Sequence, residues 1–204
     1  NKAGTDFPAL GTWGGFEEGG AHGRMAREQE IYLQNTRRWR NLPKPTIAAV
    51  QGRCIAGGLM LAWACDIIIA SDDALFCDPV VTMGVLGVEW FVHPWELGAR
   101  KAKEFLFTAD NWSAQEAHRL GMVNQVVPRA ALESTVLAMA GRIASKPAFA
   151  LAMAKQAVNQ TLDIMGQQSA VDAAFGLHHL CHAHNKEVFG TVVDPGGMPA
   201  AVKR

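Results

Sequence analysis

This 204-residue chain lacks the features that define several common protein classes. It has four cysteines, none of which forms a CxxC pair, and each lies among apolar residues. We therefore expect reduced core thiols, as in a cytoplasmic protein, and no disulfide framework. The longest apolar stretch, residues 54–65, is too short to cross a bilayer, so no membrane association is predicted.

An excess of charge of one sign is also lacking, because 19 Lys and Arg residues balance 19 Asp and Glu residues. No basic block is longer than residues 37–40, which gives no electrostatic footprint for nucleic-acid binding. Apolar residues make up 49% of the chain, which is enough for one substantial core.

The most informative stretch is residues 43–84, PKPTIAAVQGRCIAGGLMLAWACDIIIASDDALFCDPVVTMG. A β-branched run at 46–50 leads through a glycine-containing turn and Gly57-Gly58 into an apolar helix, and a second buried run follows at 67–70. A strand that enters a helix through glycines leaves backbone N–H groups unpaired, with the helix dipole behind them. Such a corner stabilises an anion or an oxygen that becomes anionic during a reaction.

Three well-known glycine motifs are missing from this stretch. Gly58-Leu59 stands where a P-loop has Lys-Ser/Thr, so the cation for a terminal phosphate is absent. Neither the GxGxxG dinucleotide fingerprint nor the GxSxG nucleophile elbow occurs. The corner is therefore not predicted to bind nucleotides or to carry a hydrolase serine.

The order of the remaining patterns indicates an α/β protein with mostly parallel strands, followed by an all-helical C-terminal part. Ser113 with Glu116 forms a capping box, and Gly121 ends the helix that it starts. The other predicted helices cover residues 21–42, 89–97, 100–107, 131–144, 148–159 and 167–189, and the other predicted strands cover 75–77 and 122–127.

Residues 41–160 resemble the enoyl-CoA hydratase/isomerase (crotonase) family, whose signature is KPxIAAVxGxxxGGGxxLAxxCDxxxAxxxAxF. The resemblance implies a spiral ββα core over residues 1–145, with further strands expected before residue 1. It also implies a helical region over 146–204 that packs on neighbouring subunits to form a homo-trimer or homo-hexamer. The matching residues are Lys44-Pro45, Ile47-Ala48-Ala49-Val50, Gly52, Gly57-Gly58, Leu61-Ala62, Cys65-Asp66, Ala70, Ala74 and Phe76.

The same resemblance assigns roles to the glycine corner. The backbone N–H of Gly57 would hold the thioester oxygen of an acyl-CoA as it becomes an enolate, with Gly58 beside the substrate. Thr5, in Ala3-Gly4-Thr5-Asp6, would supply the second N–H donor. The alternative for Gly57 is a turn glycine retained only for its backbone conformation.

The acid–base residues depart from the family pattern. Hydratases of the family use two glutamates, and their positions fall on Met60 and Val80 of this chain. Neither side chain can transfer a proton, and a positioned acid or base is typically worth about 10²–10⁴ in rate. Ordinary water addition to a double bond is therefore not expected.

Three nearby groups could replace the missing glutamates. Asp78 precedes Pro79, and its alternative is a turn aspartate that caps its own backbone. Glu89 lies in a loop that borders the acyl pocket in relatives, and its alternative is a residue at a helix start. His93 belongs to a predicted short helix, and its alternative is a histidine packed beside Trp90 and Trp95.

Two further groups of side chains admit functional and structural interpretations. Trp90, Trp95, Met60, Met83 and Val80 would line an acyl pocket or equally fill the core. The run at 178–184 contains four histidines, and two of them share a helical face, but zinc sites usually add a third ligand, and no carboxylate except Glu187 stands at a suitable spacing. We therefore predict a solvated or inter-subunit helix face and no metal site.

The sequence thus predicts a lyase or isomerase that processes acyl-CoA thioesters and needs no cofactor apart from the coenzyme A of its substrate. A non-catalytic acyl-CoA-binding protein of the same fold is the alternative, and a purely structural oligomerisation module is a third interpretation. A carboxylate or imidazole within hydrogen-bond reach of the pocket near Gly57 would favour the enzyme.

Overall fold

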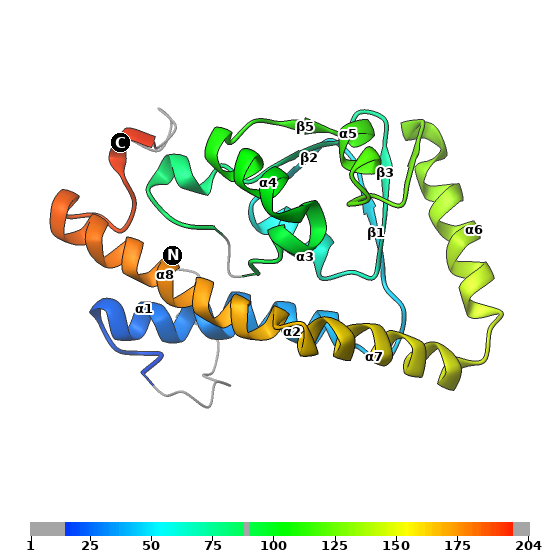
Figure 1. The fold of residues 1–204 in the computed structure, drawn as a ribbon, viewed down its shortest axis with the longest axis horizontal. Coiled ribbons are helices and arrows are strands. Elements are labelled where there is room, and N and C mark those ends of the chain that lie inside the picture. The colour runs from blue at the N-terminus through cyan, green and yellow to red at the C-terminus, as the bar shows by residue number, and fades with distance from the viewer. Residues whose placement is uncertain (1–14, 88–89, 198–204) are drawn as a thin grey trace.

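The computed structural model describes residues 15–87 and 90–197 of the chain. Its strands form two small sheets in the middle of the molecule (Figure 1). One sheet is entirely parallel, in the order β1-β3-β6, and the other has β2 parallel to β4 and β4 antiparallel to β5. The predicted preponderance of parallel strands is confirmed. The strands are β1 (Ile47–Val50), β2 (Arg53–Ile55), β3 (Ile67–Ser71), β4 (Leu75–Cys77), β5 (Trp112–Ser113) and β6 (Gln125–Val127).

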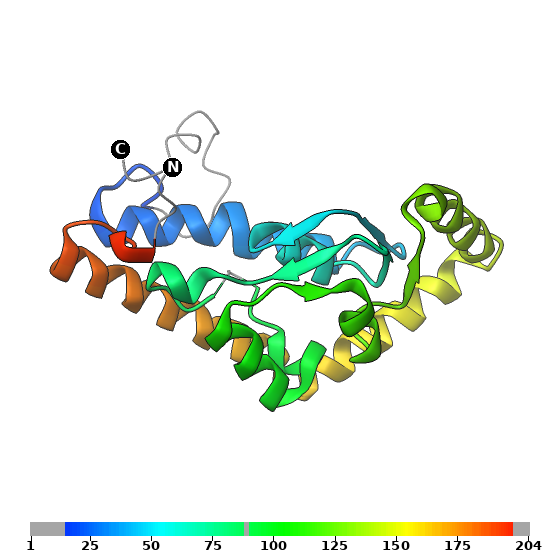
Figure 2. The same cartoon turned by 90° about the horizontal axis from the view of Figure 1, so that it is seen from above.

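The N-terminal helical segment is a rod of three consecutive parts: α1 (Gly20–Glu28), the π-helical turn η2 (Gln29–Gln34) and α2 (Asn35–Arg40). It agrees with the helix predicted over 21–42. It ends before Pro43 and Pro45, which cannot continue a helix. The long C-terminal helix α8 (Gln167–Phe189) runs beside this rod in both views (Figures 1 and 2).

Of the helices next to the sheets, two agree with their predictions and the third differs at its start. α3 (Gly57–Trp63) and α5 (Ala114–Arg119) form as expected, and the Ser113 hydroxyl accepts the N–H of Glu116 at 3.1 Å. α4 (His93–Thr108) consists of two helical parts on either side of Gly98, whose φ of 72° and ψ of 156° are not helical, so the two separate helices predicted here are present. The helix predicted over 89–97 thus begins only at 93, and Trp90 is not helical. The strand predicted over 122–127 is confined to Gln125–Val127, because residues 120–124 turn back from α5.

The C-terminal helices confirm the predictions over 131–144 and 167–189, whereas the helix predicted over 148–159 continues to Ile164. α6 (Leu132–Ala144) packs on β1 and β3 through Leu132, while α7 (Ala148–Ile164) has no buried residue in this chain. In the described part, no single helix meets the length and hydropathy criteria for a membrane span, and one pair meets them only jointly across a 105° bend. Three short 3-10 turns, η3 (Val80–Met83), η4 (Arg129–Ala131) and η5 (Pro195–Gly197), connect the larger elements.

Candidate active site

Parallel pairing of β2 and β4 brings two parts of the predicted site to one sheet edge. Ile55 pairs with Cys77, and the N–H of Ala56 donates to the carbonyl of Cys77 at 3.1 Å. Because the carboxyl ends of parallel strands meet at the same edge, Gly57 and Asp78 leave the sheet side by side. The glycine corner and the Asp78 turn, separated in sequence, therefore belong to one region.

The corner itself is open. Gly57 begins α3, Gly58 follows it, and both glycines are exposed. Within residues 15–87 and 90–197, no side chain caps this helix, so its first N–H groups have no side-chain partner there. A Cβ atom placed on either glycine would meet nothing within 4 Å in the same part of the chain, which leaves space above the corner.

The two positions at which we expected the family's glutamates lie inside the apolar core. Met60 and Val80 are 3% and 4% exposed and belong to the same hydrophobic cluster. Met83, also expected in the pocket, is partly buried against that cluster. These three side chains fill the core, and none of them can exchange a proton.

Asp78 and His93 form a fully buried pair. The Nε2 atom of His93 lies 2.8 Å from Oδ2 of Asp78, and both side chains are 0% exposed. An ionised carboxylate can only accept, so Nε2 then carries the imidazole proton and Nδ1 retains a lone pair. His93 Nδ1 and Asp78 Oδ1 have no hydrogen-bond partner within the described ranges. The Asp78 turn therefore does not cap its own backbone, and the pair has the arrangement of an acid–base dyad.

Aromatic rings enclose this dyad. The His93 ring meets the Trp63 ring edge to face at 4.7 Å and lies 4.7 Å from the Phe91 ring. His93 was predicted to pack against Trp90 and Trp95, but its ring contacts are with Trp63, Phe91 and Phe105 because the chain at 90–92 is not helical.

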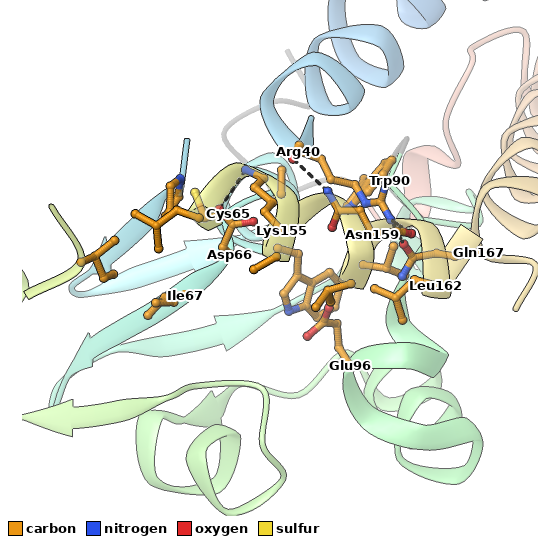
Figure 3. A pocket seen from close by; sticks show the side chains of 18 residues that line it. Arg40, Cys65, Asp66, Ile67, Trp90, Glu96, Lys155, Asn159, Leu162 and Gln167 are labelled. Carbon is orange, nitrogen blue, oxygen red and sulfur yellow. Dashed lines mark hydrogen bonds and ion pairs between the residues drawn. The ribbon is translucent and has the colours of Figure 1, made fainter. Parts of the chain in front are cut away.

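A cavity of about 460 Å³ lies between α3, α4 and α7 (Figure 3). Of the pocket residues predicted from sequence, Trp90 lines it; Trp95 is partly buried outside the lining given by the described residues. Arg40 anchors one wall, where its Nη2 donates to Asp163 Oδ1 at 2.9 Å and to Gln167 Oε1 at 3.1 Å.

Glu96, a residue that the sequence interpretation passed over, reaches toward this cavity from α4 (Figure 3). Burial raises the pKa of its carboxyl to about 7, so it exchanges a proton near neutral pH. The sequence held one sign that Glu96 belongs to this region. Glu96 follows His93 by three residues, so both lie in the first turn of the same helix.

Two predicted site residues, Thr5 and Glu89, lie outside the described residues. The histidine run differs from its prediction. His178 and His182 are each 6% exposed, so they do not form a solvated face. They turn instead toward Glu28 of α1, a residue that no local sequence pattern connects with them.

The α/β core and its glycine corner agree with the family that the sequence resembles, and comparison with known proteins identifies that family. The chain belongs to the enoyl-CoA hydratase/isomerase family, whose sequence pattern matches residues 13–191. The resemblance to the crotonase fold is confirmed by solved structures. The chain is similar to a "probable enoyl-CoA hydratase" of Mycobacterium smegmatis, with 53% identity, a TM-score of 0.84 and coverage of 85% of this chain and 72% of that one.

Other relatives extend the comparison. An enoyl-CoA hydratase/isomerase from Xanthobacter autotrophicus is 30% identical with a TM-score of 0.74, and the match covers 85% of this chain and 60% of that one. The Mycobacterium tuberculosis protein "Putative enoyl-CoA hydratase EchA13" is 50% identical over 84% of this chain and 54% of its own length. The chain thus spans about half the length of the curated relatives that it matches.

Proposed function

We propose that this chain binds acyl-CoA thioesters and stabilises an enolate-like intermediate through the backbone N–H of Gly57. The observation that supports this most directly is the open, uncapped start of α3 beside the end of β4. A thioester oxygen that gains negative charge there meets unpaired N–H groups and the positive end of a short helix. Coenzyme A enters as part of the substrate, and no separate cofactor is required.

The proposed proton-transfer group is the Asp78–His93 dyad. It follows the strand that pairs with the glycine corner, and no glutamate stands at 60 or 80 to do the same work. Asp78 would hold the imidazole in one tautomer and leave Nδ1 to take or give a proton at the acyl chain. Isomerisation, or another reaction through an enolate, fits one such group better than hydration, which needs two.

A second candidate function is non-catalytic acyl-CoA binding. Complete burial of both dyad side chains favours it, because a proton donor must reach its substrate. The two functions share the glycine corner and differ in whether the dyad takes part in any chemistry.

The test of the dyad is a pair of conservative substitutions. Asp78→Asn keeps the shape and a hydrogen bond to His93 but cannot stabilise an imidazolium, so turnover of a 3-enoyl-CoA should fall about 10²–10⁴-fold. Acyl-CoA affinity measured by calorimetry should be unchanged, because the dyad does not hold the thioester.

Glu89→Gln is the matched comparison, since Glu89 remains the other predicted acid–base residue. Loss of turnover only in Glu89→Gln would transfer the catalytic role to Glu89. Equal, measurable turnover in both variants and the parent chain would remove both residues from catalysis. Acyl-CoA binding by the parent without any turnover would favour a binding protein without chemistry.

We further propose that the chain assembles into a homo-trimer or homo-hexamer through its C-terminal helices. Large apolar side chains are left uncovered there. On α8, Ala174 is covered by its own chain, whereas Leu177 is 54% exposed. The exposed apolar residues of these helices and the turn between them are Leu137, Phe149, Met153, Val158, Ile164, Met165, Leu177, Leu180, Val188 and Phe189.

Light scattering on the eluting protein should give three or six times the mass of the chain. Ile164→Glu, at a position 87% exposed, should leave the fold intact and reduce that mass if the α7 surface lies in the interface. Exposed Val81→Glu on η3 is the control and should leave assembly unchanged. A monomer from the parent chain would contradict the proposal.

A further inference from the structure

The contact between α1 and α8 contains an unusual cluster of one carboxylate and three imidazoles. Oε2 of Glu28 lies 3.5 Å from Nε2 of His178, 3.3 Å from Nε2 of His179 and 3.7 Å from Nε2 of His182. The four side chains are mostly buried, with exposures of 18% or less. One oxygen is therefore the meeting point of three ring nitrogens from a single helix.

Several polar atoms of this cluster are unsatisfied. Glu28 Oε2, His178 Nδ1 and His179 Nε2 are buried and have no hydrogen-bond partner in the part of the chain that the structure describes. Phe175 adds an apolar wall, with its ring 4.6 Å from that of His179. A buried polar group without a partner is costly, so a cation between Glu28 Oε2 and the Nε2 atoms around it would stabilise the cluster.

The spacing of the ligand atoms matches a divalent metal ion. Nitrogen and oxygen ligands about 2.0–2.1 Å from a tetrahedral Zn²⁺ lie about 3.3 Å from one another. Glu28 Oε2 is 3.5 Å and 3.7 Å from the two Nε2 atoms of His178 and His182, and all three ligand atoms lie within 4.8 Å of one another. The two oxygen–nitrogen distances are thus within about half an ångström of the spacing around Zn²⁺.

The histidines are held in a state suited to metal binding. Nδ1 of His182 donates to the Val192 carbonyl at 2.6 Å, which leaves the lone pair of its Nε2 directed into the cluster. This is the outer hydrogen bond that commonly orients a metal-binding imidazole.

We propose that Glu28, His178 and His182 bind a divalent transition-metal ion, Zn²⁺ in the first place, which fastens α1 to α8. His178 and His182 are four residues apart and share one face of α8, while the carboxylate comes from α1. His179 or a water molecule completes the coordination. The ion bridges two helices far apart in sequence and stabilises their contact, and this role is independent of the acyl-CoA site.

The experiment measures zinc bound by the chain without a polyhistidine tag, after removal of metal with a chelator. Equilibrium dialysis against zinc chloride and metal analysis should give one Zn²⁺ per chain. Glu28→Gln and His178→Gln should each reduce the affinity at least tenfold. His184→Gln is the matched control, because His184 lies on the same helix but is exposed, and it should bind zinc as the parent does.

Two further readouts separate this site from other causes. Co²⁺ in place of Zn²⁺ should give visible bands without thiolate charge transfer, which excludes binding by the four cysteines. Zinc at about 100 times its Kd should raise the melting temperature by about 5–10 °C in the parent and in His184→Gln, but not in Glu28→Gln. If the parent binds no zinc, or Glu28→Gln and His178→Gln bind it unchanged, the cluster is an ion pair and the proposal fails.

Discussion

Gly57→Val should abolish productive acyl-CoA binding while leaving the fold intact. In the free protein a Cβ at position 57 meets nothing within 4 Å, and Gly57 lies in a helical turn without positive φ. The substitution therefore adds no clash to the folded chain itself. The added branches would occupy the space in which a thioester oxygen must approach the N–H.

Calorimetry with a non-hydrolysable acyl-CoA analogue measures the effect. We expect the affinity to fall at least tenfold, which corresponds to about 1.4 kcal/mol. Gly141→Val is the matched control, because Gly141 is also helical with free space around its Cβ but lies on α6. Unchanged affinity in Gly57→Val, with an unchanged melting temperature, would remove Gly57 from the site.

Hydration of crotonyl-CoA should be slower than in a relative with both glutamates by about 10⁴-fold, if each missing group accounts for 10²-fold or more. Water addition needs one group to deprotonate water and another to protonate the α-carbon. Met60 and Val80 can do neither, and they are packed in the core. The measurement is the loss of the conjugated thioester absorbance at matched enzyme concentration.

The double substitution Met60→Glu with Val80→Glu tests whether carboxylates alone restore hydration. Both positions are nearly inaccessible, so the new carboxyls would be buried among apolar groups, with raised pKa values and a cost to stability. We therefore expect a lower melting temperature and little recovered rate. Rapid hydration by the unmodified chain would refute this account, since it would require another acid–base pair.

Local patterns were sufficient to predict much of the fold. The helices over 131–144 and 167–189 were read from their periodicity, and the Ser113 cap from residue types three apart. The helix predicted over 89–97 was wrong at its start, because the preference of residues 90–92 for the core outweighs their helical periodicity. Such a competition between burial and helix formation is decided by tertiary contacts.

In the candidate sites, too, residues within a local motif could be predicted from sequence, whereas contacts between distant elements could not. Gly57 and Asp78 could be named from sequence because they belong to a motif, whereas the contact of Asp78 with His93 depends on how α4 enters the core. The partner of the histidine run could not be found by spacing, because Glu28 lies on a helix near the other end of the chain. Only the packing of α8 along α1 brings them together (Figure 1).

Ala56, which precedes the glycine corner, occupies a backbone conformation that residues with a side chain rarely adopt, with φ of 47° and ψ of −112°. The family signature has glycine at this place, so the chain carries a strain of about 1–3 kcal/mol that a glycine would avoid. Strained backbone persists only where its surroundings hold it from both sides. Here the Ala56 N–H is bound by Cys77 and its carbonyl by the N–H of Met60 at 2.9 Å. The orientation of the Gly57 N–H is consequently fixed in the free protein. A ligand that accepts a hydrogen bond from it would bind without a free-energy cost for orienting this group.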